Sequence, residues 1–483
     1  MIKKDRPYFF IFIPAMAISW ILFKWAYPFA DFFTDSYTYI QAAADHESIS
    51  YRPIGYSVFL RIVHAISVSD TVLVTVQYVL IQSACLTLFF FLRRHCRLAG
   101  WAQGLLIAFM ILDPAVDYIS NYVSSDALFI ALSLFWFTVL LQLLRRPSWP
   151  GLFLQLILLI LIFYTRYVAL FYPVVAALAF LLVRRDLFFR ITGIAASITV
   201  IAAGTLYTRQ LTRIQTGAPV FSAFSGWQMA NNALNSYPRI KPDTSGLPSP
   251  ACRDLNRYVR TYFENNKITT DATTAYMWEN NSPLHQYLDA YRKDNPTLSY
   301  FVAWNRVAPV FSTYGYLLLR RHPVAFSRYY LWPSAKGFFL PPLDIFAVYN
   351  EGKKDVDPIA QEWFRYSSPR PKVVSATVQA SIFAPFPWFF LLLNLGFAGI
   401  CTLFLVIPRL RLQYPSFVPC LQLAAVYLLT NACFNIFASP SVLRYQVLPL
   451  ILLFMFVVAG AGVWLNHLFA LSYCSINDKS AKP

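Results

Sequence analysis

The stretch DALFIALSLFWFTVLLQLL, residues 126–144, decides the fold class of this chain. Asp126 is its only charged side chain, and Arg145 and Arg146 follow directly after its end. An α-helix needs about 20 consecutive apolar residues to cross the hydrocarbon core of a bilayer. We therefore expect a membrane-spanning helix here, with an acidic group at one end and basic groups at the other.

Comparable stretches recur along the chain and agree with its composition. Of the 483 residues, 57% are hydrophobic and 13% are charged, whereas a soluble domain has about 45–50% apolar and about 25% charged residues. This composition excludes a soluble enzyme, a disordered tail and a fibrous protein. The prediction is an all-α polytopic membrane protein with about ten transmembrane helices. The ten stretches are 8–27, 71–92, 101–118, 126–144, 150–164, 167–183, 187–207, 383–407, 414–437 and 443–467.

Basic residues in alternate connections predict the orientation of the spans. They are Lys3, Lys4, Arg6, Arg93, Arg94, Arg97, Arg145, Arg146, Arg184, Arg185, Arg190, Arg409, Arg411, Lys479 and Lys482. The positive-inside rule makes their side of the membrane cytoplasmic. We expect an integral, multi-pass protein of the plasma or inner membrane, with both termini in the cytoplasm. The same residues explain most of the net charge of +17, so nucleic-acid binding loses its main support.

The other polar segments are then expected on the extracytoplasmic face. They include a loop at 28–70 and a large insertion at 208–382. Helical apolar spacing at 254–265 and 297–320 predicts an α-rich extracytoplasmic domain, and the Pro-rich stretch 333–342 predicts an irregular crossing. The predicted domains are an N-terminal membrane domain (1–207) that includes the loop, the extracytoplasmic domain (208–382), and C-terminal membrane helices with a short cytoplasmic tail (383–483).

Ionisable residues are expected together on this extracytoplasmic side, at the ends of the spans. The set is Asp35, Arg52, Asp113, Asp117, Asp126, Arg166 and Arg444. In lipid such a group costs from about 2.5 kcal/mol upward, so it needs a partner, a water-filled cavity or a role. Each also has a simpler interpretation. Asp126 could cap its helix, Asp113 could end one, and the arginines at 166 and 444 could reach lipid headgroups.

Taken together, these charges form a carboxylate pair with two or three arginines beside a bilayer. The guanidinium fork of arginine matches phosphate geometry, and a nearby carboxylate could accept a proton from an attacking hydroxyl or amine. A lipid-linked phosphate would bring its headgroup to this depth while its tail stays in the membrane. The combination favours transfer of a group from a lipid phosphate to an acceptor that enters from outside.

At these residues the sequence resembles the GT-C superfamily of polytopic glycosyltransferases, most of all the protein mannosyltransferases and the lipid A aminoarabinose transferases. That family has a catalytic Asp in its first outer loop, which Asp35 matches. The stretch YRPIGY, with Arg52 and Tyr56, resembles the second half of that loop. Asp126 is similar to the acidic residue that opens the fourth span, and Arg166 and Arg444 resemble arginines associated with the donor phosphate. Protein mannosyltransferases have Glu where this chain has Ser36.

The resemblance implies inverting transfer of a sugar from a polyprenyl-phosphate donor to a lipid, glycan or protein acceptor on the extracytoplasmic face. Asp35 would be the general base or would orient the acceptor, and Asp126 would position the sugar or an arginine. Three arginines would hold the leaving phosphate, and three further residues would support the site. The arginines are Arg52, Arg166 and Arg444, and the supporting residues are Tyr37, Tyr56 and Asp117.

This scheme requires no cofactor, but some GT-C relatives use a divalent metal. Asp35, Asp126 and the contiguous run Asp45-His46-Glu47 could supply ligands to such an ion. Adjacent residues in a loop rarely converge on one ion. We therefore expect a structural or solvated role for the run.

Two other functions share parts of this pattern. A polysaccharide polymerase or ligase of the outer face would have similarly large outer loops and arginines. A secondary transporter usually has Gly-interrupted helices near the midplane of the membrane. This chain has only 16 Gly, and its unusual polar residues lie at one end of the spans. The polymerase or ligase is therefore the nearer alternative, and the transporter the more distant one.

Overall fold

The computed structural model describes residues 5–96, 98–240, 246–266, 274–438 and 440–480, with side chains up to residue 468. Among the basic residues used for the orientation, Lys3, Lys4, Arg97, Lys482 and the side chain of Lys479 lie outside this part. Regular structure in the described residues is helical, apart from one isolated β-bridge between Asp31 and Tyr122.

The described part of the chain has eight helices, or pairs of consecutive helices, that are long and apolar enough to span a membrane. They are α1 (Arg6–Ala26), α4 (Asp70–His95), α5 with α6 (Gly100–Leu112, Pro114–Asn121), α7 (Ser125–Arg145), α10 (Leu187–Thr216), α19 with α20 (Val378–Phe383, Phe386–Val406), α22 (Phe417–Ala438) and α23 (Leu443–Ser480). The chain is therefore a multi-pass membrane protein, and the regular elements of its described residues are helices.

The two remaining predicted spans are also helical but shorter. They correspond to α8 (Trp149–Thr165) and to the 3-10 helix η2 (Tyr167–Phe171) followed by α9 (Tyr172–Leu182). All ten apolar stretches thus form helices, but eight rather than ten have spanning length. Helix α8 ends at Arg166, whose backbone is extended (φ −152°, ψ 130°), and Pro173 lies in the first turn of α9, so this part of the chain is divided into short helices.

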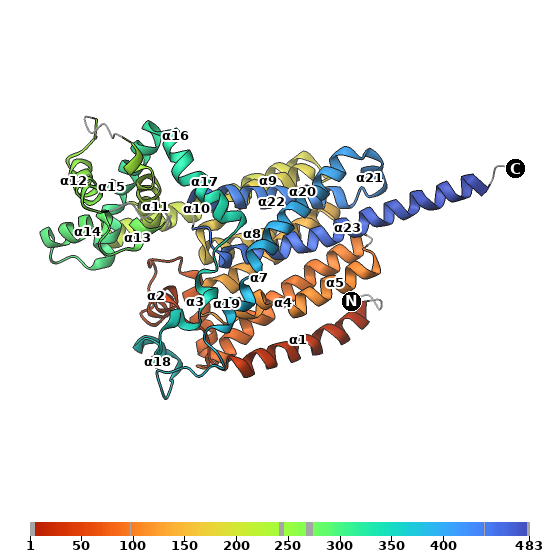
Figure 1. Ribbon diagram of the computed structural model, residues 1–483, viewed down its shortest axis with the longest axis horizontal. Coiled ribbons are helices and arrows are strands. Elements are labelled where there is room, and N and C mark those ends of the chain that lie inside the picture. Colours follow the sequence, from red (N-terminus) through yellow and green to blue (C-terminus); the bar gives the residue numbers. More distant parts are fainter. Residues whose placement is uncertain (1–4, 97, 241–245, 267–273, 439, 481–483) are drawn as a thin grey trace.

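The apolar helices lie side by side in one bundle, and both ends of the described chain lie at the same end of it (Figure 1). We call the opposite end the polar end. Helix α7 packs against α4, α8, α9, α22 and α23. Of the residues in its most apolar stretch, 78% are buried inside the protein, compared with 11% for α1. The N-terminus of α7, which carries Asp126, is therefore fixed from several sides.

Two helices of the predicted loop 28–70 lie at the polar end, α2 (Thr34–Ala44) and α3 (Gly55–Ile66). The N-terminus of α3 packs directly on the end of α8. A Cβ atom at Gly55 would lie 2.5 Å from the carbonyl oxygen of Tyr164, so only glycine allows this approach. The stretch YRPIGY is thereby placed next to Arg166.

A second domain, residues 223–318, has its own hydrophobic core at the polar end. Its helices are α11 (Ala223–Leu234), η3 (Tyr237–Arg239), α12 (Pro250–Asn265), α13 (Ala275–Trp278), α14 (Pro283–Asp294) and α15 (Tyr300–Arg321). Trp227 and Trp304 stack in this core with ring centroids 3.7 Å apart. The helices predicted at 254–265 and 297–320 are confirmed by α12 and α15.

The chain returns from the second domain to the bundle through several short helices. These are α16 (Pro323–Phe326), the π-helical turn η4 (Ser327–Leu331), α17 (Trp332–Phe339), η5 (Asp344–Ala347), η6 (Tyr349–Gly352) and α18 (Pro358–Phe364), and a further short helix, α21 (Pro408–Gln413), joins α20 to α22. The irregular crossing predicted at 333–342 is wrong as far as Phe339. Pro333 does not interrupt the helix, because the π-helical turn η4 runs directly into α17 and Leu331, just before α17, is itself helical (φ −63°, ψ −42°). Phe346 and Phe364 belong to the core of the bundle, so the predicted segment 208–382 is shared between two cores.

Candidate functional site

Asp35 lies in the first turn of α2, at the polar end of the bundle. The side chain of Ser36 accepts a hydrogen bond from the backbone N–H of Phe33 at 3.1 Å, which fixes the start of the helix. A carboxylate in the first turn also interacts favourably with the helix dipole. The Asp35 side chain is only 16% exposed, so its charge requires partners.

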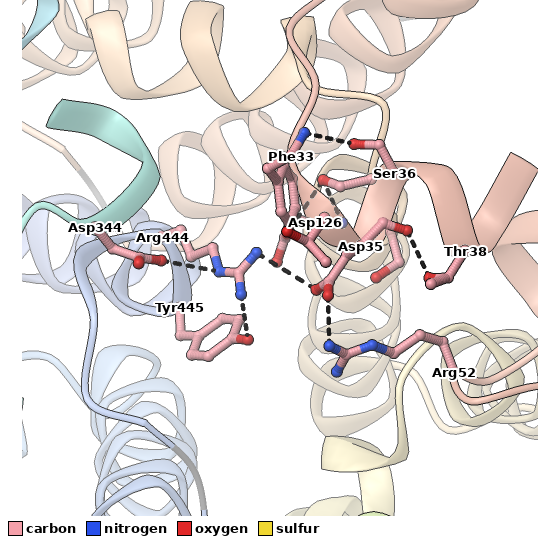
Figure 2. A network of polar contacts seen from close by, with 12 residues as sticks. Phe33, Asp35, Ser36, Thr38, Arg52, Asp126, Asp344, Arg444 and Tyr445 are labelled. Carbon is pink, nitrogen blue, oxygen red and sulfur yellow. Dashed lines mark hydrogen bonds and ion pairs between the residues drawn. The ribbon is translucent and has the colours of Figure 1, made fainter. Parts of the chain in front are cut away.

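Two arginines from distant parts of the chain provide them (Figure 2). Asp35 Oδ1 is paired with Arg52 Nη2, and Oδ2 lies 3.7 Å from Arg444 Nη1. The guanidinium group of Arg52 also lies 4.4 Å from the ring centroid of Phe224 and 6.0 Å from that of Trp278. Because both rings belong to the second domain, that domain helps to position an arginine of the site.

The charge state of Asp35 follows from these neighbours. Burial alone would raise the pKa of its carboxyl group, but the positive charges of Arg52, Arg444 and Arg166 outweigh this effect and lower the pKa. Asp35 is therefore a carboxylate at neutral pH. It becomes a stronger base only when one of these cations is neutralised by another anion.

Arg444, the second residue of α23, is held by protein groups (Figure 2). Its Nε lies 3.5 Å from Asp344 Oδ2, and its Nη2 donates a hydrogen bond to the Tyr445 hydroxyl at 2.8 Å. The guanidinium group also lies 4.7 Å from the ring centroid of Phe33. The alternative that Arg444 reaches toward lipid headgroups is therefore wrong.

Arg166 is paired with Asp126 rather than directed at headgroups, and its side chain is 16% exposed. The suggestion that Asp126 caps α7 is wrong, because the N-cap is Ser124, whose side chain accepts a bond from the backbone N–H of Asp126. The Ser124 hydroxyl donates to Asp126 Oδ2 at 3.0 Å. Arg166 lies 4.6 Å from the ring centroid of Tyr445, which also contacts Arg444. The ring of Tyr445 thus connects the Arg166 and Asp126 pair to the ion pairs of Asp35.

A cavity with about 370 Å³ of empty space, including the part open to solvent, adjoins this network. We call it the arginine cavity. Arg166, Arg444 and Asp126 form its charged wall, and the amides of Asn431 and Asn435 from α22 add polar groups. The other lining residues are Phe129, Ile130, Val168, Tyr445, Leu448 and Pro449. A cavity with guanidinium groups on one side and apolar side chains on the other fits an amphiphile with an anionic head.

No family model, curated protein or solved structure matches this chain. The site is therefore interpreted from its own geometry. Five predicted residues, Asp35, Arg52, Asp126, Arg166 and Arg444, lie in one network of ion pairs and ring contacts. They come from α2, α7, α23 and two connections, so the tertiary fold is required to assemble them.

The predicted supporting residues lie outside this network. Tyr56 is buried and donates to Gln77 Oε1 at 2.7 Å. Tyr37 stacks on Phe32, with ring centroids 6.0 Å apart. Asp117 lies in the first turn of α6, and no ion pair links it to the five charges among the described residues. Asp113 caps α6 by accepting the Ala115 N–H at 3.0 Å, which confirms its interpretation as a helix-end residue.

The carboxylates of the network do not fit a divalent metal. Asp35 uses both oxygens on arginines, and Asp126 uses one on Arg166 and one on Ser124. Within the described residues no group of three or more His, Cys, Asp or Glu is placed to hold a metal ion. In the run at 45–47, Asp45 accepts from Gln41, and His46 contacts Arg61 at 2.8 Å.

Sequence reasoning missed the residues that the segment 344–352 brings to the site. Asp344 contacts Arg444, and Glu351 lies 3.3–3.4 Å from the backbone N–H and hydroxyl of Thr34, next to Asp35. Asp344, Asn350 and Glu351 have positive φ angles of 54°, 51° and 50°, a conformation that is unfavourable for non-glycine residues by about 1–2 kcal/mol each. Tertiary contacts hold this segment, so no local pattern could have indicated it.

Proposed function

We propose that this protein is a membrane glycosyltransferase of the GT-C type, which transfers a sugar from a polyprenyl-phosphate donor to an acceptor on the extracytoplasmic face. The observation that carries the proposal is the position of Asp35 between Arg52 and Arg444. Arg444 also lines the arginine cavity among the membrane helices. An anionic group, a base and an apolar chain could therefore meet at one place.

In this proposal the donor phosphate binds Arg166 and Arg444 in the arginine cavity. Their guanidinium groups offer forked N–H donors that match phosphate oxygens, and the apolar lining accommodates the first part of the lipid tail. Negative charge grows on the phosphate as the sugar leaves. Fixed cations stabilise that charge more in a partly dehydrated site than in water.

Asp35 acts on the acceptor. The acceptor hydroxyl oxygen attacks the anomeric carbon, the bond from that carbon to the phosphate oxygen breaks, and the hydroxyl proton passes to the Asp35 carboxylate. When the donor phosphate neutralises Arg444, Asp35 loses part of its positive surroundings, and its pKa rises toward the range of an effective base. Donor binding thereby prepares the base.

The test is mass spectrometry of polyprenyl-phosphate lipids from host membranes. Membranes with the wild-type protein, without it, and with Asp35→Asn are compared, and Asp355→Asn is the matched control. Asp355 pairs with Arg370 at 2.9 Å, and its side chain is 49% exposed, away from the cavity. We expect one sugar-charged lipid to accumulate in the deletion and in Asp35→Asn, with the control resembling the wild type. Unchanged lipids in the deletion would overturn the proposed donor.

The accumulated lipid also separates the transferase from its nearer alternative. A single-sugar transferase leaves a lipid that carries one residue. A polysaccharide polymerase or ligase leaves a lipid that carries an oligosaccharide, and the mass of the lipid distinguishes the two.

A further inference from the structure

A second cavity lies between the second domain and the bundle, with about 370 Å³ of empty space including the part open to solvent. Its lining contains no charged side chain, in contrast to the arginine cavity. Five of the lining residues are aromatic: Tyr51, Tyr167, Phe221, Phe301 and Trp304. We call it the aromatic cavity. It differs from the arginine cavity in the class of ligand that it can accept.

One lining residue carries a hydrogen-bond donor without a partner. Trp304 is 4% exposed, and its Nε1 is buried with no hydrogen-bond acceptor in the described structure. The indole cannot readily turn away, because it stacks on Trp227 and its own carbonyl accepts the Trp227 N–H at 3.2 Å. A buried donor of this kind is unfavourable unless a ligand or water supplies an acceptor.

The wall formed by α10 supplies acceptors. The Thr208 hydroxyl donates to the Gly204 carbonyl at 2.9 Å, and the Thr212 hydroxyl donates to the Thr208 carbonyl at 2.9 Å. Because both protons are used within the helix, the hydroxyl oxygens act as acceptors. The Thr208 oxygen lies beside the Tyr167 hydroxyl, and the Thr212 oxygen is left for a ligand. A ligand must therefore both accept and donate hydrogen bonds, which a hydroxyl group does.

We propose that the aromatic cavity binds a neutral saccharide ring. A pyranose carries hydroxyl groups around its edge for Trp304, Thr208 and Thr212, and its C–H faces fit against aromatic rings such as the Tyr167 and Phe221 pair, whose centroids are 4.4 Å apart. The uncharged lining disfavours an acidic sugar, whose carboxylate would lose hydration without gaining a cation.

The position of this cavity assigns the saccharide to the acceptor, an assignment that rests on the proposed function. Tyr51 and Tyr167 line the aromatic cavity, while their chain neighbours Arg52 and Arg166 belong to the ion-paired network. Asp35 is paired with Arg52, which follows Tyr51, and with Arg444, which lines the arginine cavity. The ion-paired network that includes Asp35 thus lines the arginine cavity and is separated from the lining of the aromatic cavity by one residue along the chain.

The experiment is saturation-transfer difference NMR on the full-length protein in lipid nanodiscs. The probes are the methyl glycosides of glucose, galactose, mannose, rhamnose and N-acetylglucosamine, with methyl glucuronide as the charged comparison. The variant Thr208→Val/Thr212→Val removes both hydroxyl groups at nearly constant volume. Thr205→Val is the matched control, because its hydroxyl makes the same helical bond, to the Ile201 carbonyl at 2.8 Å, outside the cavity lining.

We expect at least one neutral glycoside to bind the wild type and the control, and to bind the double variant at least tenfold more weakly at an unchanged melting temperature. Equal binding by the double variant, preference for the glucuronide, or no binding of any neutral probe would overturn the saccharide site. Asp35→Asn should retain binding. If glycosides bind but the lipid analysis shows no donor, the proposed function fails and the saccharide site stands. If the donor lipid accumulates but no neutral glycoside binds, the proposed function stands and the saccharide site is wrong.

Discussion

Asp35 Oδ2 lies 3.7 Å from Nη1 of Arg444, and each residue is the second of its helix, Asp35 in α2 and Arg444 in α23. The N-terminus of a helix stabilises a negative charge and opposes a positive one. Asp35 is therefore in a favourable position, whereas Arg444 depends on carboxylates such as Asp344. A bound anion would stabilise Arg444 in the same way, which agrees with a phosphate site.

The first prediction concerns Asp35 itself. Asp35→Asn keeps the shape of the side chain but removes its charge and basicity, so we expect transfer to fall by about 10²-fold or more. The variant should still insert and elute as a single species in detergent. Turnover of the donor lipid by purified protein measures the effect, with Asp355→Asn as control. Activity within tenfold of the wild type would exclude Asp35 as the base.

The second prediction follows from the lowered pKa of Asp35. In the free enzyme the carboxylate form persists until the pH falls below the ordinary Asp value of 3.8. The kcat/KM for the donor, which reports the free enzyme, should therefore show no acid limb from Asp35 between about pH 5 and 7. Any stability from its ion pairs is present above 3.8 and is lost as the pH falls through the lowered value.

Arg52→Gln tests whether the positive charge of Arg52 keeps the pKa of Asp35 low. Among the positive charges that lower the pKa of Asp35, Arg52 has the largest effect. Removing it should raise the pKa and move the acid limb of kcat/KM to higher pH. Arg370→Gln, which breaks an exposed ion pair with Asp355, should leave the profile unchanged. An identical profile for Arg52→Gln would show that another group controls the limb.

The arrangement of helices could largely be predicted from the sequence, because apolar length is a local property. Each of the ten apolar stretches is helical, and α12 and α15 appear where their spacing indicated. The segment 344–352 could not be predicted, since its positive φ angles depend on distant partners. Asp31 accepts the Asn350 N–H at 2.8 Å, and the Tyr349 hydroxyl donates to the Ala30 carbonyl at 2.6 Å.

The site was predictable as a set of residues but not as a set of pairs. Charges at helix ends on one side of a bundle can meet, which is why Asp35, Arg52, Asp126, Arg166 and Arg444 were recognisable. Which carboxylate faces which arginine depends on how α7 and α23 are packed. The amides that α22 contributes, Asn431 and Asn435, were not predicted. Two Asn residues in an otherwise apolar stretch still fit an ordinary membrane-spanning helix.

A third prediction separates the structural and functional roles of the Arg166 and Asp126 pair. Arg166→Gln leaves Asp126 almost buried without its cation, which should destabilise the protein by about 3–5 kcal/mol. The double variant Arg166→Gln/Asp126→Asn removes both charges and should recover most of the stability. Neither variant should use the donor efficiently. Thermal unfolding and the KM for the donor measure the two effects, and full activity in the stable double variant would contradict the phosphate-binding role.

A fourth prediction concerns metal removal. The carboxylate oxygens of Asp35 and Asp126 are all engaged by arginine or serine, and nearby guanidinium groups repel a divalent cation. We therefore expect unchanged turnover after incubation with excess EDTA and dialysis into metal-free buffer. Loss of activity that added Mg²⁺ or Mn²⁺ restores would show that the arginines release these carboxylates in the working enzyme.

The fifth prediction assigns a role to Asn431, which lies in α22 and lines the arginine cavity. Its Oδ1 accepts from Asn435 at 3.0 Å, while its Nδ2 is buried without an acceptor in the described structure. That N–H group can bind a donor phosphate or sugar oxygen, so Asn431→Leu should raise the KM for the donor about fivefold to tenfold, equivalent to roughly 1–1.4 kcal/mol. The substitution also removes a buried unpaired donor, so the melting temperature should not fall.

Asn394→Leu is the matched control for this prediction, because Asn394 lies in the apolar helix α20 and donates to its own helix, to the Phe390 carbonyl at 2.8 Å. It should leave the KM unchanged. A raised KM in both variants would point to a general effect of replacing polar groups within the bundle. A raised KM in Asn431→Leu alone, at constant kcat, would place the donor against α22, since an interaction made equally in the bound and transition states changes KM and not kcat.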